Sequence, residues 1–403
     1  MKLSELPPLS LYVHIPWCLR KCPYCDFNSH EKRGELPEDE YIDALIADFE
    51  SSLPKVWGRR LHTMFIGGGT PSLFAPAAIE RLVTAVRTRI VVDPDTEITL
   101  EANPGTFEVE RFRGYRDAGV NRISVGVQSF DDAKLAAIGR VHGADEARRA
   151  LEAALAIFPR VNADLMYALP GQDLAQALAD VHAAIALGVP HVSAYHLTLE
   201  PNTHFHRFPP KLPDDDLAAD MQEAIEEALS GAGYGHYETS AFAKAGHRAK
   251  HNVNYWMFGD YIGIGAGAHG KISFPDRIVR ETRERKPQAY LRAAPLGEAI
   301  QESHDVREAE LPFEFMLNAL RLVDGFPVAL FAQRTGLPIT VIERKLAGAE
   351  KAGLIERDHA TIRPTAKGQR FLNDLLEPFL PAPDARAAMI PINISSPGTS
   401  RPS

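Results

Sequence analysis

Short apolar runs alternate with amphipathic segments over the first half of the chain. The apolar runs cover residues 11–15, 63–66, 97–101, 122–127, 161–166 and 191–196. Between them lie segments with helical periodicity at 38–53, 76–90, 109–118, 144–158 and 174–187. In the first of these, Tyr41, Leu45 and Phe49 recur at the spacing of one helix face. Six β-α units in succession predict parallel strands joined by right-handed crossovers, and therefore an α/β fold with a partial (β/α)6 barrel.

The second half of the chain has a different pattern of apolar and polar residues. A loop is expected at 203–212, a helix at 214–230, and a region rich in Gly, His and aromatic residues at 234–275. Three helices at 311–322, 327–335 and 339–352, followed by a hairpin at 354–363, predict a winged-helix-like α+β domain. We therefore expect a barrel over 1–235, a connecting region over 236–300, a C-terminal domain over 301–380 and a disordered tail over 381–403.

Charge and hydropathy exclude several classes of partner. The formal net charge of −9 over 403 residues argues against nucleic-acid binding, which needs a surplus of Lys and Arg. No apolar run approaches the length of a membrane span, and the first residues lack the apolar core of a secretion signal. Reduced thiols in such a chain predict a cytoplasmic protein.

All 3 cysteines lie within eight positions, in Cys18-Leu-Arg-Lys-Cys22-Pro-Tyr-Cys25, directly after the first apolar run. This spacing allows three thiolates to hold three irons of a 4Fe-4S cluster. No fourth cysteine exists, so the fourth iron needs an outside ligand. A structural zinc site completed by His14 or His30 is an alternative, although zinc sites favour paired Cys-x2-Cys units. A disulfide framework does not suit an odd number of cysteines.

Polar and glycine residues follow the next predicted strands. Gly67-Gly68-Gly69-Thr70 comes directly after the second strand, where backbone N–H groups could approach a small charged ligand. Four polar residues lie at or after the ends of strands three to five, namely Glu101, Gln128, Arg140 and Asp164. Strand ends of one parallel sheet face one cavity, so we expect these side chains to bind a ligand together. Each of them alone is as readily explained by a buried structural ion pair.

A second concentrated signal is His251-Asn-Val-Asn-Tyr255-Trp256. A histidine beside large aromatic residues suits an axial heme ligand, but a histidine satisfied within the core is the commoner case. The alternating Gly263, Gly265 and Gly267 predict close backbone packing. His204 and His206 could bind metal, yet two histidines on a loop are more often solvated. The third C-terminal helix carries mixed charge, so we interpret that domain as a cover or partner surface rather than a DNA reader.

These motifs together resemble a known family across nearly the whole chain. Tyr12-Val-His-Ile-Pro-Trp-Cys18, the cysteine loop, Phe65-Ile-Gly-Gly-Gly-Thr-Pro-Ser72 and Gly126-Val-Gln-Ser-Phe130 are similar to the radical S-adenosylmethionine (radical SAM) group that contains oxygen-independent coproporphyrinogen III oxidase. The His251 motif and Pro312-Phe-Glu-Phe-Met-Leu-Asn-Ala-Leu-Arg-Leu322 resemble the HemW-type heme chaperones of that group. The resemblance implies a radical SAM barrel, a 4Fe-4S cluster, S-adenosylmethionine and heme as ligands.

Carried over by position, the resemblance assigns residue roles. The cluster ligands are Cys18, Cys22 and Cys25, and His251 is the candidate heme ligand. The nucleotide contacts are Tyr12, Tyr24, Gly68, Gly69, Thr70, Glu101, Gln128, Arg140 and Asp164.

Two functions remain in competition at this point. The first is a chaperone that delivers heme to apo-hemoproteins such as respiratory-chain cytochromes. The second is the oxidase of porphyrin biosynthesis, which oxidatively decarboxylates coproporphyrinogen III. The oxidase has a further cysteine where this chain has Phe27, and a longer segment before the cysteine loop, so the chaperone is favoured. Homodimer formation and peripheral contact with membranes through partners are left open, as is a winged-helix redox regulator, which the acidic balance disfavours.

Overall fold

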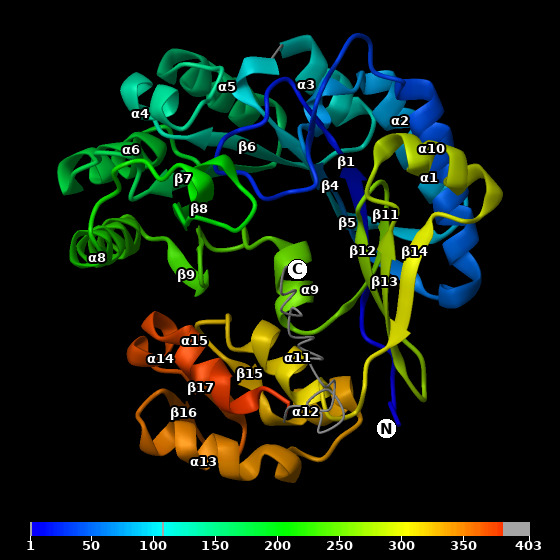
Figure 1. Cartoon of the computed structure of the whole chain (residues 1–403), viewed down its shortest axis with the longest axis vertical. Coiled ribbons are helices and arrows are strands. Elements are labelled where there is room, and N and C mark those ends of the chain that lie inside the picture. The colour runs from blue at the N-terminus through cyan, green and yellow to red at the C-terminus, as the bar shows by residue number, and fades with distance from the viewer. Residues whose placement is uncertain (1, 107–108, 382–403) are drawn as a thin grey trace, which may run out of the picture.

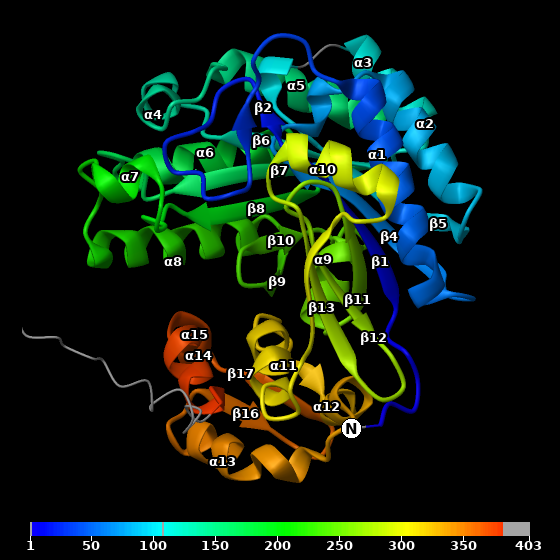
Figure 2. The same cartoon turned by 45° about the vertical axis from the view of Figure 1, so that its right-hand side comes forward.

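A computed structural model describes residues 2–106 and 109–381 of the chain. Helices and a large sheet form one lobe, and the C-terminal domain lies against the open side of that lobe (Figure 1). Helix α9 (Lys250–Trp256) lies between the two lobes in both views (Figures 1 and 2). Among the described residues no helix is long and apolar enough to cross a membrane. The predicted tail over 381–403 lies outside the described residues except for its first position.

Six neighbouring parallel strands form the centre of the large sheet. In sheet order they are β1 (Leu9–Ile15), β4 (Arg60–Gly68), β5 (Val91–Ala102), β6 (Arg122–Gln128), β7 (Arg160–Tyr167) and β8 (His191–His196). Their near-continuous apolar sequences reflect burial on both faces, as parallel sheets require. The partial (β/α)6 barrel predicted from the alternation is thus confirmed, and strand ends differ from the prediction by at most three residues except in β5, which begins at Val91 rather than at residue 97.

Helices cover the outer face of this sheet. They are α1 (Glu38–Ser52), α2 (Pro76–Arg87), α3 (Val109–Asp117), α4 (Asp132–Ala137), α5 (Ala144–Ile157), α6 (Leu174–Ala186) and α8 (Asp215–Gly231). The stripe of Tyr41, Leu45 and Phe49 on α1 is fully buried, as its periodicity predicted. A short helix α7 (His204–Arg207) occupies part of the segment expected to be a loop, because Thr203 caps it by accepting from the His206 N–H.

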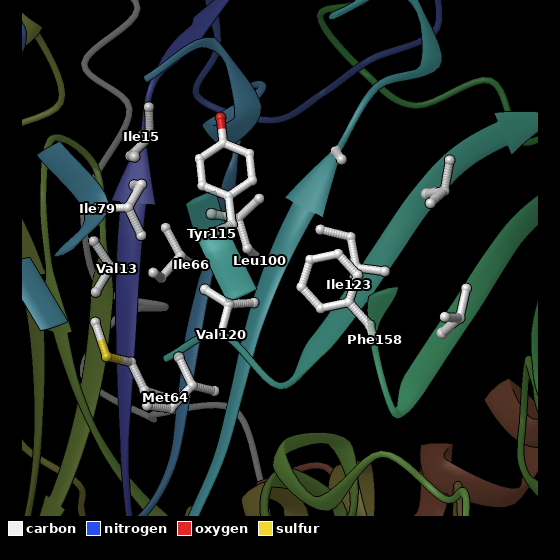
Figure 3. Packing of buried hydrophobic residues seen from close by; sticks show 14 of the residues in the cluster. Val13, Ile15, Met64, Ile66, Ile79, Leu100, Tyr115, Val120, Ile123 and Phe158 are labelled. Atoms are coloured by element: carbon white, nitrogen blue, oxygen red, sulfur yellow. The ribbon is translucent and has the colours of Figure 1, made fainter. Parts of the chain in front are cut away.

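Strand and helix side chains interlock in the barrel core (Figure 3). Val13, Ile66 and Leu100 come from three adjacent strands and are completely buried. Ile79 of α2 and Tyr115 of α3 pack against this layer from outside the sheet. This close-packed layer fixes the strands whose C-terminal ends carry the polar residues of the site.

Residues 236–300, expected as a connecting region, contribute strands to both edges of the large sheet. One edge gains β10 (Ala241–Ala243) and β9 (Gly235–Glu238), and the other gains β11 (Asp260–Ile264), β12 (His269–Ser273), β13 (Ile278–Arg283) and β14 (Ile300–Asp305). A short helix, α10 (Pro287–Ala293), separates the last two of these strands. Close packing at the alternating glycines is confirmed. A Cβ on Gly263 would lie 1.9 Å from the His269 carbonyl oxygen, and one on Gly265 would lie 2.3 Å from that of His14.

The C-terminal domain has its own core. It contains α11 (Leu311–Ala319), α12 (Val328–Thr335), α13 (Glu343–Lys351), α14 (Ala366–Arg370) and α15 (Leu372–Leu376), with a small sheet of β15 (Phe326–Pro327), β17 (Thr361–Pro364) and β16 (Ile355–Arg357). Phe315 of α11 makes edge-to-face contacts with Phe326 and Phe331 inside the domain and with Phe258 outside it. The three helices and hairpin expected of a winged-helix-like domain are therefore present.

Candidate functional site

The cysteine loop lies at the C-terminal end of β1, between the short strands β2 (Trp17–Cys18) and β3 (His30–Glu31). The Cys25 N–H donates to the Cys22 carbonyl (3.1 Å), and the Lys21 ammonium donates to the carbonyls of Phe27 (3.1 Å) and Ser29 (3.2 Å). All three thiols are free and half-buried. One backbone hydrogen bond and two from the Lys21 side chain therefore hold the loop.

Burial and one charged neighbour define the surroundings of the three thiols. Burial raises the pKa of the Cys18 and Cys25 thiols. Arg140 Nη1 donates to the Cys22 sulfur (3.6 Å). No group of His, Cys, Asp or Glu among the described residues converges closely enough to hold a single metal ion. A cubane cluster instead takes one thiolate per iron at separate corners.

A cavity of about 370 Å³ joins the cysteine loop to the strand ends. It is lined by all three cysteines and by every predicted nucleotide contact but one, namely Tyr24, Gly68, Gly69, Thr70, Glu101, Gln128, Arg140 and Asp164. The exception is Tyr12, whose buried hydroxyl bonds His14 Nδ1 (2.8 Å) and which lines a neighbouring cavity. The convergence expected from parallel strand ends is thus present in the structure.

The glycine run differs from expectation in its hydrogen bonding. The Gly68 N–H donates to Glu101 Oε2 (3.0 Å), the Gly69 N–H to the Ile15 carbonyl (2.7 Å) and the Thr70 N–H to the Trp17 carbonyl (2.7 Å). These three N–H groups are engaged within the protein, although Gly68, Gly69 and Thr70 line the cavity, so their contact with a ligand stays a prediction. The glycines serve close packing, because a Cβ on Gly69 would lie 2.5 Å from the Trp17 oxygen.

Two half-buried carboxyl groups, Glu101 and Asp164, give the cavity its charge character. Burial and the nearby Asp164 raise the pKa of Glu101 to about 8. Burial also raises the pKa of Asp164, although Ser124 Oγ (2.9 Å) and Asn162 Nδ2 (2.8 Å) donate to its carboxylate. Two neighbouring carboxyl groups are difficult to ionise together because their negative charges repel. A cationic ligand between them would stabilise their ionised forms. The sulfonium and ammonium groups of S-adenosylmethionine have that chemistry.

Gln128 and Arg140 complete the opposite wall. Gln128 has φ of 68°, an uncommon conformation for a residue with a side chain, at a bulge that ends the regular pairing of β6 with β7. Arg140 Nη2 donates to the Gly126 carbonyl (2.7 Å), whereas its buried Nε has no hydrogen-bond partner among the described residues. An orphaned buried donor in a lined cavity is consistent with a site built for a polar ligand.

A second and larger cavity, of about 600 Å³, adjoins the first. Its walls come from β1, β4, α9, β11–β13 and α11, so the barrel, the sheet extension and the C-terminal domain all contribute. Asp26, Phe27, Gly68 and Glu101 line both cavities. The cysteine loop thus forms part of the wall of each chamber.

His251 lies behind this cavity rather than in its wall. Its Nδ1 bonds Glu97 Oε1 (2.8 Å), its backbone N–H donates to the same oxygen (3.1 Å), and its ring stacks on Phe65 at 4.3 Å. The side chain is buried and lines neither cavity, whereas Tyr255 and Trp256 of the same helix line the larger one. His206 Nδ1 bonds the Leu199 carbonyl (3.2 Å), and His204 and His206 line neither cavity.

Sequence reasoning missed the residues that link the cysteine loop to the sheet extension. Asn28 Nδ2 donates to the carbonyls of Ala266 (2.8 Å) and Arg285 (2.8 Å). His269 and Arg285 line the larger cavity. Their only signal in the sequence was the density of Gly, His and aromatic residues in this region, which does not indicate where they point.

Comparison with family models matches two parts of the chain. The radical SAM superfamily model matches residues 12–184, and the HemN C-terminal domain model matches residues 306–371. Among solved structures, the chain superposes on coproporphyrinogen III oxidase HemN of Escherichia coli with a TM-score of 0.79. That match has 24% identity and covers 93% of this chain and 90% of the other, so it supports the fold.

Comparison with characterised sequences gives whole-length matches. The heme chaperone HemW of Escherichia coli is 50% identical over 94% of this chain and 100% of its own length. HemW of Haemophilus influenzae is 47% identical over 94% of this chain and 99% of its own. The mitochondrial radical S-adenosyl methionine domain-containing protein 1 of Bos taurus is 34% identical over 91% of this chain and 86% of its own.

Proposed function

Because this chain belongs to the HemW family within the radical SAM superfamily, we propose that it binds heme and delivers it to apo-hemoproteins. The observation that carries the proposal is the 600 Å³ cavity beside the cysteine loop. Its volume suits a single large organic ligand, and aromatic side chains such as Tyr255 and Trp256 in its wall suit a flat apolar macrocycle. Respiratory-chain cytochromes are recipients of the appropriate chemistry, and the proposed site of action is the cytoplasm.

The chain also carries residues that fit a cluster and a nucleotide. Cys18, Cys22 and Cys25 would hold three irons of a 4Fe-4S cluster, and Glu101 and Asp164 would face the positive groups of S-adenosylmethionine. When bound, the cluster supplies an electron that can cleave the nucleotide. Arg140 donates to the Cys22 sulfur, and Gln128 lies at the strand bulge and lines the same cavity.

His251 is the ligand that the family motif favours. Glu97 accepts from its Nδ1, which is the arrangement that orients histidine ligands toward a metal through Nε2. The heme would then have to reach past Phe65, against which the imidazole is stacked.

The competing function is oxidative decarboxylation of coproporphyrinogen III. Phe27 occupies the position of the oxidase's additional cysteine and is 59% exposed between the two cavities. A phenyl ring can neither ligate iron nor donate a proton there. We therefore expect no decarboxylated product, although the predicted cluster ligands and nearly all the predicted nucleotide contacts line one cavity.

One anaerobic experiment separates these functions. The full chain with reconstituted cluster is incubated with heme and, separately, with coproporphyrinogen III and S-adenosylmethionine under reducing conditions. We expect a Soret band from bound heme, transfer of that heme to an apo-cytochrome added afterwards, and no porphyrinogen product. Product at many turnovers without heme binding would favour the oxidase. Binding without transfer would limit the function to heme binding.

A further inference from the structure

Two histidines line the larger cavity, and their hydrogen bonding differs. His14 is buried with both ring nitrogens engaged, Nδ1 with the Tyr12 hydroxyl (2.8 Å) and Nε2 with the Asn28 carbonyl (3.0 Å). His269 is exposed to the cavity and its imidazole has no hydrogen bond within the described part of the chain. An open imidazole in a lined cavity is available to a metal, whereas His14 would have to break two bonds.

The position of His269 is rigid. It begins β12, where its backbone pairs with Thr282 of β13. The missing side chain of Gly263 lets the His269 carbonyl approach the neighbouring strand closely. Burial, followed by the nearby Arg285 and Arg280, lowers the pKa of His269, which keeps the imidazole neutral near pH 7. Strand pairing thus fixes the point at which His269 leaves the sheet, and its neutral imidazole is available to a metal.

The cations of the cavity also differ in availability. Lys271 is bound to Asp260 (2.8 Å), and Arg280 is paired with Glu314 and donates to the Tyr261 hydroxyl (2.9 Å). Arg285 lines the cavity and its guanidinium makes no ion pair with any described residue. Its main chain is held in place, because its carbonyl accepts from Asn28 Nδ2. The Arg285 guanidinium, carried on a fixed main chain, is therefore free to bind a carboxylate.

The apolar rim supplies the third feature. Phe27 is 59% exposed and Leu317 of α11 is 42% exposed, and both border this cavity. Large apolar side chains left open around a cavity indicate an apolar ligand. Tyr255 packs edge-on against Tyr261 (4.9 Å) in the same wall. Apolar walls, an open imidazole and a free guanidinium match a planar metal macrocycle with carboxylate side chains.

We infer that heme binds in the cavity between the cysteine loop, the sheet extension and α11, with His269 on the iron and Arg285 on a propionate. The inference rests on the proposed heme-binding function and deepens it by naming the site. In this site His251 does not ligate the iron and remains the buried partner of Glu97 behind Phe65.

The test is a titration of the full chain with ferric heme, followed by Soret position, spin state and affinity. His269→Ala should weaken binding by roughly tenfold or more and shift the Soret band. Added imidazole should restore the wild-type spectrum in this variant, because it can fill the vacated ligand position. His206→Ala removes a histidine outside the cavity and serves as the matched control, with no expected change.

Arg285 is tested through the ligand as well as the protein. Arg285→Ala should weaken heme binding several-fold at an unchanged Soret position, and Arg285→Lys should recover part of the loss. Arg285→Ala should not change the affinity for heme dimethyl ester, because the esterified propionates carry no charge. A loss that persists with the ester would overturn the proposed carboxylate contact.

The outcomes distinguish an error in the proposed heme site from an error in the proposed heme-binding function. If the wild type binds heme while His269→Ala keeps both affinity and spectrum, the site is wrong and the proposed function stands. The site is equally wrong if His251→Ala alone loses the histidine spectrum and regains it with imidazole. If the wild type binds no heme, the proposed function fails as well.

Discussion

Glu101 should couple nucleotide binding to proton release. Its pKa of about 8 means that the carboxyl is about nine-tenths protonated at pH 7. Burial is the main cause and Asp164 adds to it, so a positively charged ligand in this cavity favours ionisation. If the bound nucleotide returns the pKa to its ordinary range, binding releases about 0.9 proton at pH 7 and about 0.1 at pH 9.

This proton release sets how the affinity for the nucleotide changes with pH. A group whose pKa falls on binding makes affinity rise with pH, here by nearly tenfold per unit up to about pH 7, and level off above about pH 9. A cluster on the three thiolates adds negative charge nearby, which raises the pKa of free Glu101 further. The effect should therefore persist in the cluster-loaded protein.

Anaerobic calorimetry in two buffers of different ionisation enthalpy measures the released protons directly. The informative quantity is the difference in released protons between the wild type and Glu101→Gln. Taking this difference cancels the protons that the amine of the nucleotide itself loses. Glu80→Gln, on the exposed face of α2, is the matched control and should behave as wild type. Equal proton release by wild type and Glu101→Gln would refute the assignment of this carboxyl to the nucleotide site.

Three further substitutions test the cluster, the buried His251 pair and the core. Cys22→Ala leaves only two cysteine ligands. After anaerobic reconstitution this variant should lack the brown chromophore and the iron and sulfide of the cluster. Stoichiometric zinc in the wild type would contradict the cluster assignment. His251→Ala removes a buried hydrogen bond to Glu97 and should lower the free energy of unfolding by about 2 kcal/mol in denaturant titrations, so an unchanged midpoint would contradict the pairing. Leu100→Ala should cost about 3 kcal/mol because the residue is fully enclosed, while Leu296→Ala, 71% exposed, should cost little, and equal losses would argue against this core (Figure 3).

The barrel and the composition of the first cavity follow from the sequence alone. Apolar periodicity reports which face of each element is buried, and six alternating units leave one simple parallel arrangement. Parallel strands then bring their C-terminal ends to one edge, so Glu101 and Asp164 had to meet near the cysteine loop. That inference needs no knowledge of side-chain contacts.

The contacts around the barrel and the first cavity depend on tertiary packing. The glycine N–H groups are used by neighbouring strands, and His251 is held by Glu97 across 154 residues of sequence. Asn28 reaches Arg285 across 257 residues, which brings the sheet extension against the cysteine loop and forms the larger cavity. Periodicity shows that a side chain is buried but carries no information about a partner so distant in the chain, because that pairing is set by how the folded elements pack.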